Sequence, residues 1–398
     1  MSRDSTGTPR PLPVRPNLRH LKAQARDLVK AGAARSISEA QFQVARLYGF
    51  ASWPRLKAHI EALPELGVQP ARLTPTALVA AITMFLADQD LLTLADIREA
   101  LDQELTAAGP PALLRLHERL LAETGWDFSP ADPLAKRVHR VLADRLLESG
   151  STLIGIDHVH AIGRRPVGIV SNHLSYADAN LIEILLQRSG GAALADRLVA
   201  IAGPKVYSSR KRRFSSLCFG TIKTPQSSAV STDEATMSPR EVARAARQSI
   251  DVAHERLRQG DALMVFAEGT RSRTRTLQAL LPGAARYLEG PDAWVLPVGI
   301  VGTDAMFPIG EDVLHRVRIE IQVGRPFGGR VLQKLAGGDR QIMMNAIGLA
   351  IAELLPAAYQ GAYRDERDEL AEAERVLNSA RTHDGAVPGR RRGPSNQM

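Results

Sequence analysis

Residues 167–186 read VGIVSNHLSYADANLIEILL, and the fold can be argued outward from this stretch. Its first four residues form a short apolar run typical of a buried strand. Its last part carries apolar residues at helical spacing, namely Leu181, Ile182, Leu185 and Leu186. The polar residues between the two parts predict a strand-to-helix turn. The stretch therefore predicts one β–α unit.

Similar runs recur along the second half of the chain. Residues 198–201, 262–266 and 295–300 are short and apolar, and residues 317–323 alternate as in a strand with one wet face. A helix is predicted between Ser238 and Gly260, because Ser238-Pro239-Arg240-Glu241 is a capping box with proline at the first helical position. Strands alternating with helices indicate an α/β fold with a mostly parallel central sheet flanked by helices, which we assign to residues 151–360.

The chain ahead of this domain is predicted to consist of all-α domains. Residues 17–66 carry three apolar stripes at helical spacing and are expected to form a small three-helix module. This module resembles a helical segment at the front of some bacterial ankyrin-repeat proteins. Residues 74–150 are expected to be a further helical region with a connector at 126–133. At the two ends we expect a disordered lead over 1–16, and a charged helix with a disordered basic tail over 361–398.

Composition narrows the partners and the compartment. The 398 residues carry a formal net charge of +8, which favours an anionic partner such as phospholipid headgroups or a phosphorylated substrate. A single cysteine, Cys218, excludes an intramolecular disulfide framework and suits a reducing cytosol. The longest apolar run, residues 77–87, is shorter than the roughly 20 residues that span a bilayer. We therefore expect a cytoplasmic protein that associates peripherally with the cytoplasmic face of an anionic membrane.

The turn after the first strand carries a possible acid–base pair, His173 and Asp178. A histidine titrates near working pH and suits a general base, and a carboxylate behind it fixes the ring tautomer. On a continuous helix, residues five apart would lie about 140° apart around the axis. The pair can therefore meet only if His173 lies in the turn and Asp178 in the first turn of the helix. Alternatively, Ser175-Tyr176-Ala177-Asp178 is a plain capping box and Asp178 is a helix-start carboxylate.

A second polar string, Glu268-Gly269-Thr270-Arg271-Ser272, follows the strand-like run at 262–266. Ligands gather beyond the carboxyl ends of strands in open α/β sheets. Gly269 would let the backbone approach a bound group, and the guanidinium of Arg271 suits a phosphate. The alternative is a solvated, arginine-rich loop whose charges pair with Glu268.

Taken together, the two strings resemble the HxxxxD and EGTRS signatures of the glycerolipid acyltransferase superfamily, which includes lysophosphatidate and glycerol-3-phosphate acyltransferases. The resemblance covers about residues 150–325. It implies that His173 is the general base and that Asp178 orients it. It further implies substrate-binding roles for a set of neighbouring residues: Asn172, Glu268, Gly269, Thr270 and Arg271. Pro297 matches a fourth family block, and the alternative for it is a proline of an edge or terminal strand.

The second family block is only partly present. Gly203-Pro204-Lys205 and Gly220-Thr221-Ile222 fit it, but Lys223-Thr224-Pro225-Gln226 stands where the family has an acidic residue and an arginine. That arginine helps to hold the acceptor phosphate in the family, so Lys205 or Lys223 is expected to substitute. In the third block, Ala267 replaces the usual proline.

The basic run Arg210-Lys211-Arg212-Arg213 has three open interpretations. It is a membrane-surface patch, a site for phosphates of CoA or of the acceptor, or a solvated basic loop. A nucleic-acid partner is not expected, because aromatic residues are not interleaved with these charges.

The resemblance implies an enzyme that moves a fatty acyl chain from an acyl thioester, acyl-CoA or acyl carrier protein, to a hydroxyl of a lysophospholipid or glycerol-phosphate-like acceptor. No metal or organic cofactor is expected, since the sequence holds no CxxC and no HExxH. The alternative is a catalytically idle or regulatory protein that binds membranes peripherally. A serine hydrolase is disfavoured because no Gly-x-Ser-x-Gly elbow is present.

Overall fold

The computed structural model describes residues 18–48, 50, 52–62, 95–121, 128–203, 206, 210–225, 239–306, 308, 315–365 and 368–383. The chain divides into two compact units, Met1–Arg72 and Leu73–Met398. The predictions of a disordered lead, of an apolar stripe within 77–87 and of a basic tail after 383 lie outside the described residues.

The first unit contains the three helices predicted for residues 17–66. They are α1 (Leu18–Lys30), α2 (Ile37–Leu47) and α3 (Trp53–Ala62). Ser36 caps α2 by accepting a hydrogen bond from the backbone N–H of Glu39 at 3.1 Å. Leu21, Val44 and Leu56, one from each helix, are buried in a shared core. The apolar stripes of the sequence therefore pack against one another.

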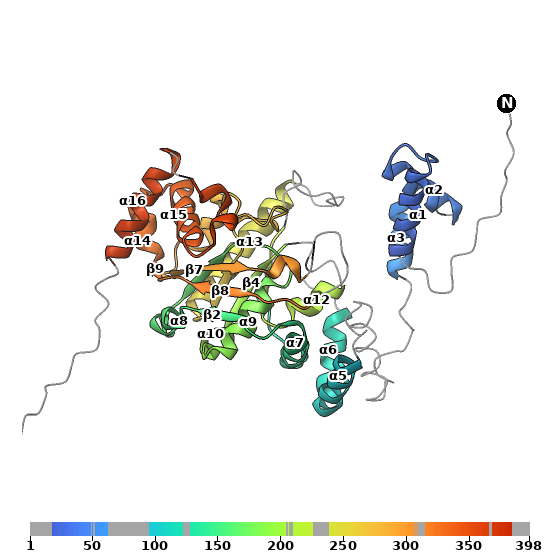
Figure 1. Cartoon of the computed structure of the whole chain (residues 1–398), viewed down its shortest axis with the longest axis horizontal. Helices are drawn as coiled ribbons and strands as arrows, with labels where there is room; N and C mark the ends of the chain where they lie inside the picture. Colours follow the sequence, from blue (N-terminus) through green and yellow to red (C-terminus); the bar gives the residue numbers. More distant parts are fainter. Residues whose placement is uncertain are drawn as a thin grey trace, which may run out of the picture. The chain divides into compact units, whose positions relative to one another are not determined.

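The second unit is built on one mixed sheet with the strand order β1-β5-β4-β6-β3-β7-β8-β2 (Figure 1). The strands are β1 (Phe128–Ser129), β2 (Thr152–Ile154), β3 (Val167–Ser171), β4 (Leu198–Ala202), β5 (Gly220–Lys223), β6 (Ala262–Val265), β7 (Trp294–Val301), β8 (Glu320–Val323) and β9 (Phe327–Gly328). The central strands β5, β4, β6, β3 and β7 are all parallel. Antiparallel pairing occurs between β1 and β5, and between β7 and both β8 and β9. The predicted α/β fold with a mostly parallel sheet is confirmed.

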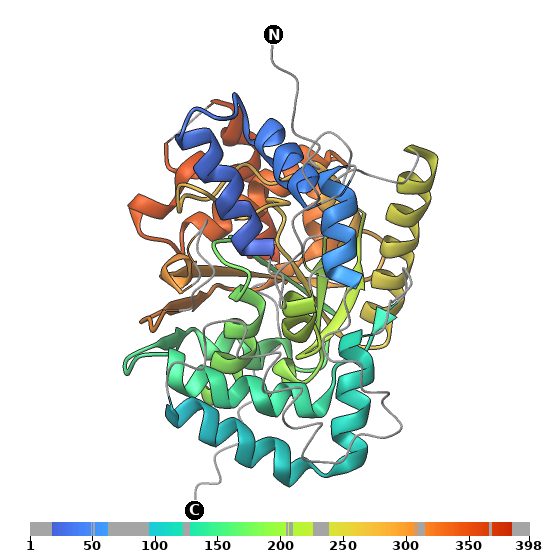
Figure 2. The same ribbon diagram turned by 90° about the vertical axis from the view of Figure 1, so that its right-hand side faces the viewer.

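Helices cover both faces of the sheet (Figures 1 and 2). One layer holds α7 (Pro133–Leu146), α8 (Ile156–Ile162), α9 (Asp178–Arg188) and α10 (Ala192–Ala195), and α5 (Ala95–Ala108), α6 (Pro110–Leu121) and α12 (Arg210–Ser216) share its core. The other holds α13 (Pro239–Arg258), η3 (Pro282–Tyr287), α14 (Gly329–Leu335), α15 (Arg340–Ala352) and α16 (Asp368–His383). Strand residues alternate between the two cores, as Ile169 and Val170 do in β3.

Some elements differ from the sequence-based expectation. The connector predicted at 126–133 contains the edge strand β1, and Asp132 caps α7 through bonds from the N–H groups of Leu134 and Ala135. Helices α5 to α7 contribute to the same hydrophobic core as the sheet. The helix near the end of the chain, α16, buries an apolar stripe that contains Leu370, Val376 and Leu377.

Pro297 lies inside the central strand β7, so the alternative of an edge or terminal strand proline does not hold. β7 is flanked by β3 on one side and by β8 and β9 on the other. On that other side, β9 pairs with residues 294 and 295, and β8 pairs with residues 298 to 301. Pro297 falls in the gap between these two partners, where a strand proline removes no bond of the antiparallel ladder. Its carbonyl still accepts a hydrogen bond from the N–H of Gly324 at 2.9 Å.

The parallel strands end at a common edge of the sheet. Ser171 ends β3, Val265 ends β6 and Val301 ends β7, and these three strands are neighbours in the order β6-β3-β7. The loops that follow them therefore emerge side by side. Within the described part of the chain, no helix combines the length and apolarity needed to cross a bilayer.

Candidate active site

His173 and Asp178 meet in the turn between β3 and α9. The imidazole Nδ1 lies 2.8 Å from Oδ2 of Asp178. Asp178 is the first residue of α9 and is fully buried, whereas the side chain of His173 remains 16% exposed. The ring also stacks on Phe266, with centroids 4.3 Å apart. Because Nδ1 faces the carboxylate, Nε2 is the ring nitrogen left to accept a proton.

Asp178 has further hydrogen bonds that hold its carboxylate in place. Oδ2 accepts hydrogen bonds from the backbone N–H groups of Leu174 at 2.7 Å and Ser175 at 2.9 Å. The N-cap of α9 is Ala177, and the hydroxyl of Ser175 accepts from the N–H of Ala177 at 3.3 Å, so the predicted capping box is not formed. Asp178 is still a helix-start carboxylate, and the same carboxylate closes the turn and orients the imidazole.

Thr303 is a member of the site that the sequence analysis missed. It lies in the short 3-10 helix η4 (Thr303–Ala305) just after β7, and its hydroxyl donates to Oδ1 of Asp178 at 2.6 Å. Thr303 is fully buried. The turn before it depends on Gly302, whose φ is +91° and where a Cβ would lie 2.6 Å from the carbonyl oxygen of Arg318. A glycine directly after an apolar strand was the available signal.

Asn172 fastens the His173 turn to the neighbouring strand. Its side-chain amide donates to the carbonyl of Ile300 at 2.9 Å, and its amide oxygen accepts from the N–H of Ile300 at 2.8 Å. The side chain is fully buried. In this structure, the residue predicted to bind substrate therefore uses its amide group to position the turn.

Glu268 holds the backbone of His173. Its Oε1 accepts from the N–H of His173 at 2.6 Å, and its Oε2 accepts from the N–H of Gln278 at 2.9 Å. Glu268 is only 5% exposed, and burial raises the pKa of its carboxyl from 4.5 to about 7, against the lowering effect of the two backbone hydrogen bonds. The N–H of Ser272 donates to the carbonyl of His173 at 2.8 Å. The loop 268–272 therefore binds His173 through both its N–H and its carbonyl.

The guanidinium of Arg271 joins the same cluster from this loop. It lies over the ring of Tyr176, with 3.7 Å between the guanidinium carbon and the ring centroid. Arg271 is half-buried, whereas Arg273 and Arg275 are exposed. Arg275 forms an ion pair with Asp304 of η4 at 2.8 Å. Arg271 thus differs from its exposed neighbours, for which the solvated-loop interpretation fits better.

Gly269 and Thr270 form the exposed tip of the loop. The φ of Gly269 is +71°, and a Cβ at this position would lie 2.6 Å from a methyl carbon of Leu281. The backbone conformation therefore favours glycine here, whereas the exposed and flexible side chain of Leu281 can move aside for a Cβ.

The structure describes only one of the two lysines proposed to replace the missing arginine. Lys223 ends β5 at the same edge of the sheet and is 7% exposed. Two strands, β4 and β6, lie between β5 and β3. At the usual spacing between strands, the distance from β5 to β3 is about 14 Å. Lys205 lies outside the described residues.

The basic run at 210–213 belongs to helix α12, so it is not a loop. Arg213 donates to the carbonyl of Leu120 at 3.0 Å, and Phe214 is buried. The membrane-surface and phosphate-binding interpretations of this run stay predictions.

Residues 151–301 match the family model described as Acyltransferase. The chain carries an acyltransferase domain. The matched stretch contains both the His173 turn and the 268–272 loop, and the predicted relationship to the glycerolipid acyltransferase superfamily is confirmed. Thr303 lies two residues beyond the matched stretch of this acyltransferase domain.

The structure is also similar to the crystal structure of the 1-acyl-sn-glycerophosphate (LPA) acyltransferase PlsC from Thermotoga maritima. The two share 16% sequence identity with a TM-score of 0.38, over 71% of this chain and 98% of that chain. No curated protein matches the chain significantly.

Proposed function

We propose that this acyltransferase moves a fatty acyl chain from acyl-CoA or acyl carrier protein to a hydroxyl of a lysophospholipid or glycerol-phosphate-like acceptor. The observation that carries the proposal is the 2.8 Å contact between His173 Nδ1 and Asp178 Oδ2, in a turn that the 268–272 loop binds on both sides. A base, its orienting acid and an arginine form one connected cluster at the carboxyl edge of the sheet.

The proposed reaction uses Nε2 of His173, the ring nitrogen that does not face Asp178. Nε2 of His173 takes the proton of the acceptor hydroxyl while the oxygen attacks the thioester carbonyl carbon. A carbon–oxygen bond forms, the carbon–sulfur bond breaks, and the imidazolium returns the proton to the leaving thiolate. Asp178 stabilises the imidazolium and keeps the proton on Nδ1 throughout. The products are an ester and a free thiol, and no covalent enzyme intermediate is needed.

Arg271 supplies the charge that would hold an acceptor phosphate. A guanidinium presents several N–H donors in a plane and suits two phosphate oxygens at once. Its stacking on Tyr176 restricts its motion beside the His173 turn. This arrangement supports an acceptor with a phosphate near its reacting hydroxyl, as lysophospholipids and glycerol phosphate have.

The proposed association with a membrane rests on the net charge of the protein. The formal net charge of +8 favours an anionic lipid surface, where a lysophospholipid acceptor resides. We therefore include peripheral association with the cytoplasmic face of the membrane in the proposed function. Binding to anionic vesicles that weakens as salt is raised would support it, because salt screens surface charge.

The decisive experiment is mass spectrometry of the lipids formed by purified protein. The protein is incubated with acyl-CoA or acylated carrier protein and with a panel of lyso-acceptors, and His173→Ala protein serves as the matched control. We expect an esterified product from at least one pair with wild type and none above background with His173→Ala. Equal product from both proteins would remove His173 from the mechanism. Salt-sensitive vesicle binding without turnover on any pair would favour the idle membrane-binding alternative.

A further inference from the structure

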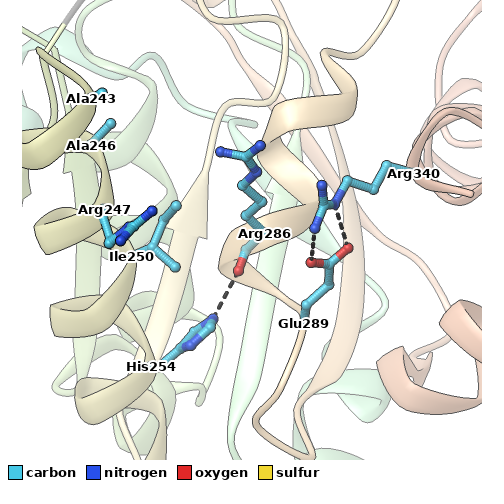
Figure 3. Close-up of a pocket in the computed structure, with 8 residues that line it drawn as sticks. All are labelled: Ala243, Ala246, Arg247, Ile250, His254, Arg286, Glu289 and Arg340. Carbon is cyan, nitrogen blue, oxygen red and sulfur yellow. Dashed lines mark hydrogen bonds and ion pairs between the residues drawn. The ribbon is translucent and has the colours of Figure 1, made fainter. Parts of the chain in front are cut away.

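A pocket of about 390 Å³ opens on the opposite layer of the domain, between α13, η3 and the start of α15 (Figure 3). None of its lining residues belongs to the His173 turn or to the 268–272 loop. Its volume lies within the range of roughly 300–1,000 Å³ common among ligand pockets. The site is therefore separate from the one proposed for acyl transfer.

One wall of this pocket is apolar. Ala243, Ala246 and Ile250 lie three and four residues apart on α13, so they form one stripe of the helix. The rest of α13 is rich in arginine, with five among its twenty residues. A stripe of this kind provides a surface for a short hydrocarbon segment.

Arginine side chains from three elements also line the pocket. Arg247 comes from α13, Arg286 from η3 and Arg340 from α15 (Figure 3). Arg340 is paired with Glu289 through two contacts of 2.7 and 2.8 Å, so its charge is matched and its position is fixed. The side chains of Arg247 and Arg286 make no hydrogen bond or ion pair within the part of the chain that the structure describes. Both side chains are exposed to solvent and carry positive charge that no described carboxylate offsets, so an anion in the pocket would meet two guanidinium groups as donors.

The walls are tied to one another without a ligand. Nε2 of His254 on α13 donates to the carbonyl of Arg286 at 2.8 Å. Five residues earlier, the hydroxyl of the buried Ser249 lies 3.1 Å from the hydroxyl of Tyr287 at the end of η3. These two links hold α13 and η3 in register, so the pocket is formed before binding and less conformational entropy is lost when a ligand enters.

We propose that this pocket binds an amphiphilic oxyanion. Its phosphate would contact Arg247 and Arg286, and its short hydrocarbon segment would lie against Ala243, Ala246 and Ile250. Such a ligand meets both the unmatched positive charge and the apolar wall. A free phosphate would use only the first of these features, and a neutral alcohol only the second.

Nuclear magnetic resonance of the full-length protein, labelled at the δ1 methyl groups of isoleucine, tests the proposal. The signal of Ile250 is assigned from an Ile250→Val sample, and the protein is titrated with hexyl phosphate, inorganic phosphate or hexanol. We expect a saturable shift of this signal with hexyl phosphate, at least fivefold weaker binding of inorganic phosphate, and no saturable shift with hexanol. Equal affinity for the two phosphates, or no shift with either, would overturn the proposal.

Matched variants test the charge. The double variant Arg247→Gln, Arg286→Gln should lower the affinity for hexyl phosphate at least tenfold. Arg244→Gln makes the same change one turn earlier on α13, outside the pocket, and should alter it less than twofold. The remaining isoleucine signals report whether each variant keeps its fold. An equal loss in Arg244→Gln would show a diffuse charge effect and refute the site.

The readout does not depend on acyl transfer. Arg271→Ala protein, which lacks the phosphate-binding group proposed for the other site, should bind hexyl phosphate at the Ile250 pocket with unchanged affinity, whether or not the enzyme activity proposed above is found. Loss of the Ile250 shift in Arg271→Ala would place the ligand at the other site and contradict the inference.

Discussion

The backbone N–H of His173 donates a 2.6 Å hydrogen bond to Oε1 of Glu268, a residue 95 positions later in the chain. The other carboxylate oxygen accepts from the N–H of Gln278. The resemblance to acyltransferases implied a role for Glu268 in acceptor binding. In this structure its carboxylate instead anchors the loop that carries the base. A role in positioning the base predicts a lower kcat, whereas a role in acceptor binding predicts a higher KM.

Glu268→Gln should lower kcat and leave the KM for the acceptor within about twofold. The amide nitrogen of glutamine would face one of the two backbone N–H donors, so one anchoring bond is lost and His173 is held less well. A displacement of about 1 Å at a reacting group costs on the order of a hundredfold in rate, so we expect a ten- to hundredfold fall in kcat. Steady-state kinetics against acceptor concentration measure this. A variant with normal kcat and a raised KM would return Glu268 to acceptor binding.

The pKa of Glu268 also predicts how stability depends on pH. Burial raises this pKa from 4.5 to about 7, so the folded state binds more protons than the unfolded state between these values. Stability from this group is therefore greatest below about pH 4.5 and is lost as the pH rises to about 7. At roughly 1.4 kcal/mol per pKa unit, the loss is on the order of 3 kcal/mol.

Urea unfolding at pH 5 and pH 8 checks this prediction. The free energy of unfolding of wild type relative to Glu268→Gln should fall between the two pH values. Glu255→Gln, an exposed glutamate on α13, is the control and should show no comparable change. A difference between wild type and Glu268→Gln that does not vary with pH would mean that Glu268 ionises normally in the folded protein.

Thr303→Val should slow catalysis while the protein stays folded. The substitution keeps the side-chain shape and removes the hydroxyl that donates to Asp178 Oδ1 at 2.6 Å. A hydrogen bond to a charged group contributes about 1.5–3 kcal/mol, so we expect kcat to fall about ten- to hundredfold. Thr303→Ser retains the donor and should keep most of the activity. If valine and serine behave alike, the hydroxyl does not position Asp178.

Asp178→Asn should abolish most of the activity and also destabilise the turn. Asparagine can favour the wrong imidazole tautomer, a change that costs about 10⁴-fold in serine protease triads. Its amide nitrogen would also face one of the donors now bound by the carboxylate, at about 1–3 kcal/mol. Single-turnover assays and thermal unfolding measure the two effects separately. Activity near that of wild type would show that His173 needs no anionic partner.

Arg271→Ala should chiefly raise the KM for a phosphate-bearing acceptor. Loss of a charged hydrogen bond of about 1.5–3 kcal/mol corresponds to roughly ten- to hundredfold weaker binding. Arg273→Ala removes an exposed charge two residues away and should change the KM less than twofold. Similar effects of both substitutions would indicate general attraction of the acceptor by a basic loop.

Elements with a continuous apolar run, a strand alternation or a helical period were predictable from the sequence, including the four-residue strands β6 and β8. The β3–α9 unit and α13 carry clear strand or helix patterns and were predicted correctly. The strands β1, β2, β5 and β9 have two to four residues each, and none lies in a long apolar run or a full alternating stretch. They exist because their neighbours in the sheet provide backbone partners.

In the site, contacts between residues close in sequence were predictable and contacts between distant residues were not. The placement of His173 and Asp178 followed from local geometry, because a turn and the first residue of a helix bring the two side chains together. Thr303 and the anchoring bonds of Glu268 could not be predicted in this way. Asp178 and Thr303 are 125 positions apart, and only the adjacency of β3 and β7 in the sheet makes them neighbours.

The pairing of Asn172 with Ile300 and of Asp178 with Thr303 has a consequence for synthesis on the ribosome. Each pair joins residues more than a hundred positions apart, and the later partner lies in or just after β7. A nascent chain that lacks this strand contains His173 and Asp178 but not the backbone and hydroxyl groups that hold their turn in place. Catalytic activity should therefore appear late in translation, after β7 has been synthesised and has paired with β3.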